Sequence, residues 1–146
     1  MKISTHVRYG ARLMFRLALE YGKGFSLLKD IAKQEGLSEK YLSLIVIPLK
    51  AKGLILSARG AKGGYVLSKA PSAISMWDIV SALDGDLSEP KCLTNQKRCK
   101  RYETCVMRDV WKQLEENIQK TLSSITLQNL VEMHEKNQDM SIDYII

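Results

Sequence analysis

The sequence is poor in the residue types from which active sites are commonly built. It has only two histidines in 146 residues, and neither lies near a cysteine or serine in a recognisable catalytic spacing. It also lacks a glycine-rich phosphate-binding loop and paired carboxylates in an apolar setting. We therefore expect that the protein is not an enzyme and has no small-molecule substrate.

Long hydrophobic runs are also missing. The longest, Tyr41–Leu49, is too short to span a bilayer and contains Pro48. Near the start of the chain, Arg8, Arg12 and Arg16 interrupt the sequence before the apolar segment of a secretory signal could form. We expect no membrane association and a cytoplasmic location, where cysteines serve as thiols or metal ligands rather than as structural disulfides.

Acidic residues are scarce in the first half of the chain. Residues 1–69 hold 13 of the 22 lysines and arginines but only four acidic residues, which gives this half a net charge of +9. The remaining 77 residues hold 9 basic and 12 acidic residues, a net charge of −3, and the whole chain carries +6. This asymmetry indicates that the N-terminal half meets a polyanion, with a lysine-rich solubilising surface as the alternative interpretation.

Apolar periodicity and capping residues predict three helices in this basic half. The first extends from about residue 5 to residue 21, and Ser26 is the expected N-cap of the second. Ser38 is the expected N-cap of the third, which covers about residues 39–52. Because Pro48 lacks a backbone N–H, we expect a kink or an early end near Ile47.

The second and third helices, at about residues 28–51, have the spacing of a helix-turn-helix. Ala32 is the small residue where the two helices would touch, and Gly36 makes the turn between them. In such a pair the second helix enters the major groove of DNA with its N-terminal residues foremost. The residues expected near base edges or phosphates are Ser38, Glu39, Lys40, Tyr41 and Ser43.

A hairpin is predicted directly after the helix-turn-helix, at about residues 54–68. Two strand-like segments flank a turn that contains four glycines or alanines around Lys62, and Arg59 lies at the start of that turn. A hairpin in this position is a wing, and an arginine on a narrow loop can enter a minor groove. We therefore predict a winged helix-turn-helix domain over residues 1–85 that binds double-stranded DNA through Arg59 and Lys62 as well as through the third helix. An incidental surface hairpin is the alternative.

The C-terminal part is predicted to be a long helix, residues 105–125, followed by a short last helix from Thr126 and an apolar tail. A four-residue apolar ladder marks the long helix: Val106, Val110, Leu114, Ile118 and Leu122. A helix that projects from a compact unit needs another surface to bury this face, and a second copy of the chain would supply it. The predicted fold class is therefore mainly α with a small β-hairpin: a winged helix-turn-helix domain plus a long C-terminal dimerisation helix and tail over residues 105–146. A core stripe within a monomer is the alternative.

All three cysteines, Cys92, Cys99 and Cys105, fall in or next to a predicted loop at residues 86–104. Soft thiolates suit zinc or an iron–sulfur cluster. The gaps of six and five intervening residues do not match the tight knuckle of structural zinc sites. The loop also supplies five cations that could partly neutralise a bound cluster. On spacing alone, a cluster, a zinc site and free thiols all stay open.

Further motifs run along nearly the whole chain. They are the opening Met-Lys-Ile-Ser-Thr, the block at residues 37–42, Gly53-Leu54 and, above all, the Arg-Gly-x-x-Gly-Gly-Tyr segment at residues 59–65. Together they resemble the IscR/NsrR/CymR family of bacterial repressors. The resemblance implies a homodimer crossed by its long C-terminal helices, with one recognition helix on each half-site of a two-fold operator. The family commonly has Glu-Gln where this chain has Ser43 and Leu44, so we expect an altered sequence preference.

The resemblance also bears on the cysteines. A Cys-x6-Cys-x5-Cys pattern just before a long helix resembles the cluster-binding branch of the family, whereas the branch typified by CymR lacks such a triad. It implies an iron–sulfur cluster on Cys92, Cys99 and Cys105, with 2Fe-2S favoured and 4Fe-4S as the alternative. The two positions that carry the fourth ligand in other branches hold Arg108 and Arg8 here, and arginine does not ligate iron.

Several candidates for the fourth ligand therefore stay open, namely His6, Glu103, Asp109, an exogenous thiol and water. The function that the sequence predicts is a repressor whose operator binding is modulated by the cluster and whose targets include genes of iron–sulfur cluster biogenesis. The alternatives are a DNA-binding regulator that uses the cysteines as a thiol, zinc or nitric-oxide switch, and a protein–protein adaptor that never touches DNA.

Overall fold

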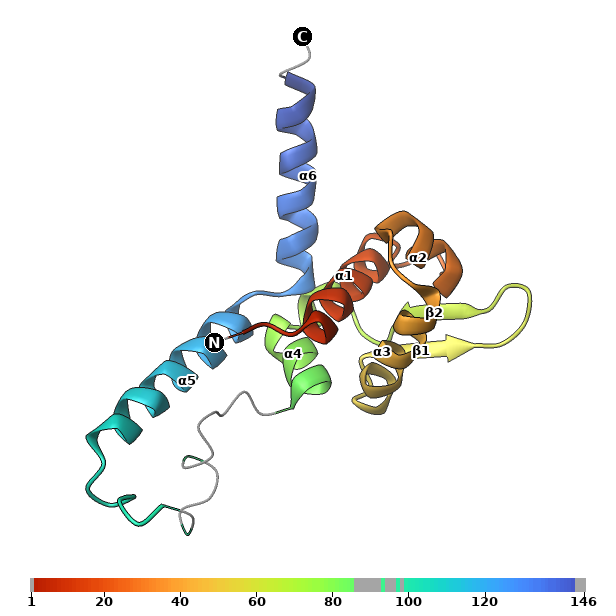
Figure 1. Cartoon of the computed structure of the whole chain (residues 1–146). Helices are drawn as coiled ribbons and strands as arrows, with labels where there is room; N and C mark the ends of the chain where they lie inside the picture. Colours follow the sequence, from red (N-terminus) through yellow and green to blue (C-terminus); the bar gives the residue numbers. More distant parts are fainter. Residues whose placement is uncertain (1, 86–92, 94–96, 98, 144–146) are drawn as a thin grey trace.

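A computed structural model describes residues 2–85, 93, 97 and 99–143 of the chain. Within these residues it contains six α-helices, one 3-10 turn and a two-stranded antiparallel hairpin (Figure 1). In chain order they are α1 (Thr5–Leu19), α2 (Leu28–Glu35), α3 (Glu39–Ala51), β1 (Ile55–Ala58), β2 (Gly64–Leu67), η1 (Pro71–Ala73), α4 (Met76–Asp84), α5 (Val106–Ser124) and α6 (Leu127–Asp143). The predicted fold class, mainly helical with one small hairpin, is confirmed.

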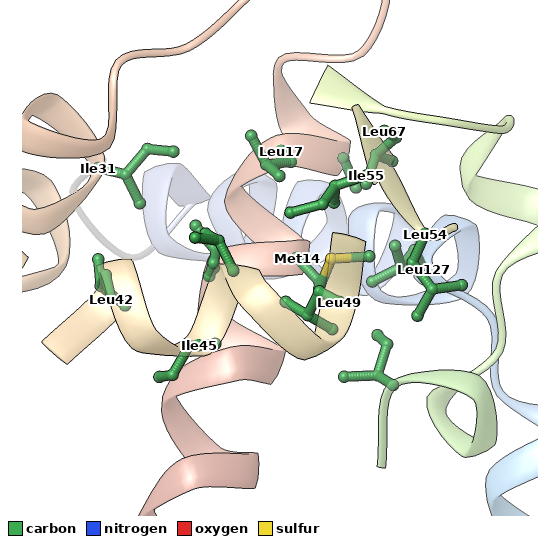
Figure 2. Close-up of a cluster of buried hydrophobic side chains, with 14 of the residues drawn as sticks. Met14, Leu17, Ile31, Leu42, Ile45, Leu49, Leu54, Ile55, Leu67 and Leu127 are labelled. Atoms are coloured by element: carbon green, nitrogen blue, oxygen red, sulfur yellow. The ribbon is translucent and has the colours of Figure 1, made fainter. Parts of the chain in front are cut away.

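Helix α1 is the centre of the hydrophobic core. It contacts α2, α3, α4, α6 and β2, because its apolar residues recur every three or four positions and so form one buried face. Figure 2 shows Met14 and Leu17 of this face among the side chains of the other elements. The labelled partners are Ile31, Leu42, Ile45, Leu49, Leu54, Ile55, Leu67 and Leu127. Each large aliphatic side chain buried in this way contributes roughly 1.5–3 kcal/mol to stability.

The turn between α2 and α3 has the geometry that the sequence predicts. Gly36 ends α2 with a left-handed backbone, φ 63°, and the N–H of Leu37 donates to the carbonyl of Ala32 at 2.9 Å. The hydroxyl of Ser38 then accepts the N–H of Tyr41 at 3.3 Å and caps α3. Because this turn is short and capped on both sides, the orientation of α3 relative to α2 is fixed.

Ser26 does not cap α2, so that prediction was wrong. The N-cap is Leu27, which makes no side-chain capping bond. The backbone of Ser26 is instead paired with β2: its N–H donates to the carbonyl of Tyr65 at 2.9 Å, and the N–H of Tyr65 donates back at 2.8 Å. This isolated bridge ties the start of the helix-turn-helix to the wing.

The same bridge explains a glycine of the wing motif. In the hairpin, Ile55 lies opposite Leu67 and Ala58 lies opposite Gly64. Gly64 has φ 132°, and a Cβ at this position would collide with the carbonyl oxygen of Ser26. Only glycine satisfies both the backbone conformation and the close approach.

Helix α3 continues past Pro48 and ends at Ala51, so of the two predicted effects of Pro48 the early end near Ile47 is excluded and the kink stays a prediction. The proline removes one backbone donor, but its own carbonyl accepts the N–H of Lys52 at 3.0 Å. Leu49 is fully buried, and α3 packs on β1. Burial of this last turn therefore outweighs the loss of one backbone hydrogen bond.

The two C-terminal helices are both long. Helix α5 has 19 residues and α6 has 17, so the expectation of a short last helix was wrong. Their junction is fixed to the N-terminal part: Leu127 is fully buried, its N–H donates to the carbonyl of Ile74 at 2.9 Å, and the N–H of Met76 donates to the carbonyl of Ile125 at 2.8 Å. From this junction the helices extend in different directions (Figure 1).

The start of α6 also packs on α1, where the rings of His134 and Phe15 meet edge to face with centroids 5.4 Å apart. The far end of α6 is exposed. The predicted apolar tail begins there with Ile142, which is exposed, and residues 144–146 of that tail lie outside the described residues. Over the described part of the chain, no helix has both the length and the apolar character needed to cross a membrane.

Candidate functional site

Helix α3 has one buried face and one outward face. Leu42, Ile45, Val46 and Leu49 point into the core. The opposite face starts with Glu39 and Lys40, which are exposed, and α3 lies beside the wing (Figure 1). A helix-turn-helix presents its second helix to DNA through such a face.

The five residues predicted on this helix separate into two groups. Glu39, Lys40 and Ser43 are exposed, and the hydroxyl of Ser43 donates to the carbonyl of Lys40 at 2.6 Å. Ser38 serves as the helix cap. Tyr41 is half-buried and packs edge-on against α1, with its ring 5.6 Å from that of Tyr9 between centroids. Ser38 and Tyr41 therefore hold the helix in place.

The wing, whose strand β1 packs on α3, carries two cations in its turn. Arg59 and Lys62 lie in the turn between β1 and β2, and both are exposed. Neither forms a salt bridge with any residue that the structure describes. Lys50, which sequence reasoning missed, connects α3 to the wing because its Nζ donates to the Ser57 hydroxyl at 2.6 Å. The result is a cationic surface shared by α3 and the hairpin.

Two apolar residues that were not among the predicted DNA-contacting residues also lie on the outward face of α3, although the comparison with the family had already singled out position 44. Leu44 is 57% exposed and Ile47 is 62% exposed. The signal that could have identified them is the helical phase, since positions 44 and 47 fall opposite the buried positions 42, 45 and 49.

A charged cluster fixes α2 to α1. Arg12 Nε donates to Glu35 Oε2 at 2.9 Å, and Arg16 donates to Glu35 Oε1 from Nη2 at 2.7 Å. Arg12 also donates to the backbone carbonyl of Glu35 at 2.5 Å. Partial burial alone would raise the pKa of Glu35, but the hydrogen bonds and charges of Arg16 and Arg12 outweigh it and hold that pKa below the ordinary value. Glu35 is therefore ionised at neutral pH and anchors the end of α2.

The cysteine segment is described in part. Cys99 and Cys105 are half-buried free thiols, whereas Cys92 lies outside the described residues. Cys105 directly precedes α5 and is its N-cap. Between the two cysteines, the N–H of Tyr102 donates to the carbonyl of Cys99 at 3.1 Å. Among the residues with described positions, no group of three or more potential ligands could hold a metal ion.

Arg108 holds the turn before Cys105. Its Nη1 donates to the carbonyl of Tyr102 at 2.6 Å, and its guanidinium lies 4.7 Å from the centre of the Tyr102 ring. It also donates to Asp109 Oδ1 from Nε at 3.2 Å and from Nη2 at 3.1 Å, and this hydrogen bonding raises the pKa of Arg108 above its ordinary value. One of the candidate fourth ligands, Asp109, is thus engaged by an arginine.

The other protein candidates for a fourth ligand lie in different settings. Glu103 is exposed. His6 lies on α1 and faces α4, where its Nδ1 is 3.3 Å from the carbonyl oxygen of Leu83, and its ring meets Tyr41 edge-on. His6 therefore contributes to packing beneath the recognition helix.

The predicted ladder of α5 is exposed over its first three members, Val106, Val110 and Leu114, whereas Ile118 and Leu122 are half-buried. None of the α5 residues is buried, and Val106 is 75% exposed. The other exposed large apolar residues of this helix are Met107, Val110, Trp111 and Leu114. An apolar stripe of this length on one face of a helix marks an interaction surface.

The fold combines a helix pair joined by a glycine turn, an outward-facing second helix and a hairpin that carries an arginine. The Ser26–Tyr65 bridge connects this hairpin to the start of the helix pair. Together these features define the winged helix-turn-helix class of DNA-binding regulators. Within that class, the chain belongs to the Rrf2 family, described as iron-dependent transcriptional regulators, whose model matches residues 3–133.

Named relatives support the same assignment. The chain is 39% identical over 145 residues to the HTH-type transcriptional regulator CymR of Bacillus subtilis, covering 99% of this chain and all of that protein. The structure of that CymR, described as the global cysteine regulator, matches with a TM-score of 0.76 over 91% of this chain and 98% of that chain at 38% identity.

IscR proteins are also among the relatives. The IscR regulator of Erwinia tasmaniensis is 34% identical over 135 residues, which cover 92% of this chain and 81% of that protein. The structure of T. potens IscR matches with a TM-score of 0.78 and 36% identity over 94% of this chain and 91% of that chain. The relatives are transcriptional regulators, so the expectation that the chain is not an enzyme is confirmed, as is the family resemblance.

Proposed function

We propose that the protein is a homodimeric transcriptional repressor that binds a two-fold DNA operator and acts in the cytoplasm. In this proposal residues 1–85 bind DNA, residues 86–104 hold the sensing cysteines and residues 105–146 dimerise. The observation that carries it is the outward face of α3 next to a wing whose Arg59 and Lys62 have no described salt-bridge partner. Cations that have no salt-bridge partner, on a wing next to a helix that enters the major groove, can bind the phosphates of the DNA backbone.

Each candidate residue has a role in this proposal. Glu39, Lys40 and Ser43 face base edges or phosphates from the first turns of α3. Ser38 and Tyr41 lie at the same end of the helix and fix its position, and in the proposed complex they contact the DNA backbone. Arg59 enters a minor groove and Lys62 contacts a phosphate.

The experiment that tests DNA binding measures the dissociation constant for selected duplexes over a range of salt concentrations. We expect steep salt dependence, and we expect Lys62→Ala to reduce the slope of log K against log salt by about 1, as one phosphate contact is lost. The matched control is Lys136→Ala on α6, a lysine that is exposed far along the chain from the wing. Absence of affinity for any duplex at low salt, with and without metal, would contradict the proposal and favour a protein–protein adaptor.

The dimer is proposed to form through the exposed apolar face of α5. This face has no buried residue within the chain, and a second copy would cover it with an identical stripe. The dimer would then place one copy of α3 on each half-site of the operator.

The cysteines are proposed to hold an iron–sulfur cluster, with 2Fe-2S favoured. The donor chemistry fits, because Cys99 and Cys105 are half-buried free thiols on either side of one turn, and soft thiolates are the ligands that such clusters take. Together with Cys92 they would supply three ligands. When bound, the cluster provides a redox- and oxygen-sensitive centre.

The chain's own residues would convert cluster loading into a change of DNA affinity. Arg108 holds the Tyr102 turn, which connects the cysteines to α5, and α5 in turn packs on α4. Binding of a cluster by the cysteines would therefore set the position of α5, the proposed dimer helix, relative to the recognition helix. The targets proposed for such a regulator are genes of iron–sulfur cluster biogenesis.

The cluster is tested by anaerobic purification with an optical spectrum and counts of iron and sulfide. We expect a coloured protein, and we expect loss of visible absorbance in Cys92→Ala, Cys99→Ala and Cys105→Ala. A colourless protein without iron or sulfide after reconstitution would contradict this part. The second candidate, a thiol- or zinc-switched regulator, is favoured by the full-length match to CymR and would leave bound zinc or reversible thiol oxidation in place of colour.

A further inference from the structure

Two large aliphatic side chains lie on the surface that faces away from the core of α3. Leu44 is 57% exposed and Ile47 is 62% exposed, and they are three residues apart, so they occupy one patch on the helix. The core already has its own set of α3 residues, so this pair is not required for folding. Neighbouring apolar residues exposed on a helix that is otherwise polar on this face mark a contact surface.

The surroundings of this patch are cationic. Lys40 lies one turn before Leu44, and Lys50 lies one turn after the patch with its Nζ 2.6 Å from the Ser57 hydroxyl of the wing. Arg59 and Lys62 extend the positive surface along the hairpin. A partner that fits must therefore carry negative charges on both sides of an apolar centre, which describes a duplex seen from its major groove.

Hydrogen bonding from the middle of this face is limited. Ser43, next to Leu44, directs its hydroxyl proton to the carbonyl of Lys40 at 2.6 Å. Leu44 and Ile47 themselves have no polar atoms. The only apolar group that base pairs present in the major groove is the C5 methyl of thymine.

We propose that Leu44 and Ile47 determine operator specificity by packing against thymine methyl groups in each half-site. This inference rests on the proposed binding of DNA through α3. Leu44, nearer the N-terminal end of α3, contacts the methyl group deeper in the half-site, and Ile47 contacts a methyl group towards its edge. Cytosine at the same position lacks the methyl group and is bound less tightly.

The test begins with duplexes recovered by the full-length protein from a random-sequence pool. In the best duplex, each thymidine is replaced in turn by deoxyuridine, which removes one methyl group and leaves every hydrogen-bonding group unchanged. At one or two positions per half-site, we expect the affinity of the unmodified protein to fall about fourfold per methyl group.

Variants assign the effect to the two side chains. Leu44→Ala and Leu44→Gln are expected to bind the thymidine duplex more weakly and to show no further loss with deoxyuridine at one of those positions. Ile47→Ala is expected to do the same at the other. The matched control is Met133→Ala, which truncates an equally exposed apolar residue of α6 and should keep full sensitivity to the methyl group. Circular dichroism and the thermal midpoint show that each variant is folded.

The outcomes separate this inference from the one on which it rests. If no duplex is recovered or bound at low salt, DNA binding itself is wrong and the inference is wrong with it. If duplexes are bound but deoxyuridine has no effect at any position, only the methyl contact is wrong. Unchanged sensitivity in both Leu44→Ala and Ile47→Ala would likewise overturn it, because another residue would then contact the methyl groups.

Discussion

At the scale of single residues, one carboxylate organises the joint between α1 and α2. Glu35 receives hydrogen bonds from Arg12 and Arg16 on the preceding helix, and its side chain is only 12% exposed. Arg12 is more exposed than Arg16, so solvent screens part of this interaction. The cluster is nevertheless well placed to fix the helix that positions α3.

Replacing this carboxylate should destabilise the protein. We expect Glu35→Gln to lower the free energy of unfolding by about 1–3 kcal/mol at pH 7, because charged hydrogen bonds are lost and two arginines are left without their partner. The measurement is urea denaturation. Glu116→Gln, whose side chain is 65% exposed and lies 3.9 Å from Lys112, is the control and should change stability by less than about 0.5 kcal/mol.

The free energies of unfolding of the unmodified protein and of Glu35→Gln should converge at low pH. Because the folded-state pKa of Glu35 lies below its ordinary value of 4.5, its contribution is fully present above pH 4.5 and is lost as pH falls through the lower, folded-state pKa. The difference between the unmodified protein and Glu35→Gln should therefore shrink in acid. A difference that stays constant down to pH 3 would show that charge at this residue is not the cause.

Gly64 is a second residue at which a single substitution should change stability, because there is no room for a Cβ atom at this position. Gly64→Ala should destabilise the fold by about 2–3 kcal/mol, since the new Cβ meets a carbonyl oxygen and the backbone has positive φ. Gly22→Ala is the control: its φ is 83° but the space around it is open, so only the conformational cost of about 1–2 kcal/mol applies. Amide hydrogen exchange at Ser26 and Tyr65 should accelerate in Gly64→Ala alone. Equal effects of the two substitutions would argue against the collision.

At the scale of elements, α5 is a helix whose apolar side chains are not fully covered by the rest of the described chain. Val110 and Leu114 lie on its exposed apolar face, and Lys112 lies on the opposite side. The double substitution Val110→Asp and Leu114→Asp should leave the subunit folded, because neither side chain is buried in it. It should weaken self-association at least about 100-fold, because two carboxylates would be buried in an apolar interface.

Sedimentation equilibrium measures this association directly. Lys112→Asp introduces a carboxylate on the other side of the same helix and should leave the dissociation constant of the dimer within a few-fold. Two results would contradict the proposed dimerisation through α5. One is a double variant that stays dimeric, and the other is an unmodified protein that is monomeric.

At the scale of the whole molecule, the junction between α5 and α6 would connect assembly to DNA binding in the proposed dimer. Ile125 and Leu127 make backbone hydrogen bonds to Met76 and Ile74, so α5 cannot move without moving this segment. A dimer joined in this way has a defined separation between its two recognition helices.

That rigidity can be tested on the DNA. Inserting five base pairs between the half-sites of a selected operator rotates one of them by about half a helical turn, and we expect affinity to fall to the non-specific level, at least about 100-fold. Substituting five base pairs at the same place without changing the length is the control. If the insertion is tolerated, the two DNA-binding units are joined flexibly.

Local sequence rules account for much of this protein. The cap at Ser38, the turn at Gly36 and the hairpin at residues 54–68 follow from residue types and short spacings, because each depends on hydrogen bonds within a few residues. The same rules located the outward face of α3, with Glu39, Lys40 and Ser43, and the apolar ladder of α5.

Contacts between distant segments decided the rest. Ser26 pairs with Tyr65 across the fold instead of capping its own helix, and α3 runs through Pro48 because burial of Leu49 holds its last turn. The helical phase sets Leu44 and Ile47 opposite positions 42, 45 and 49, and the fold shows that positions 42, 45 and 49 are buried while Leu44 and Ile47 stay exposed. The sequence alone therefore determined elements and class, whereas packing determined which side chains were left free to meet DNA, since burial is a property of the assembled fold.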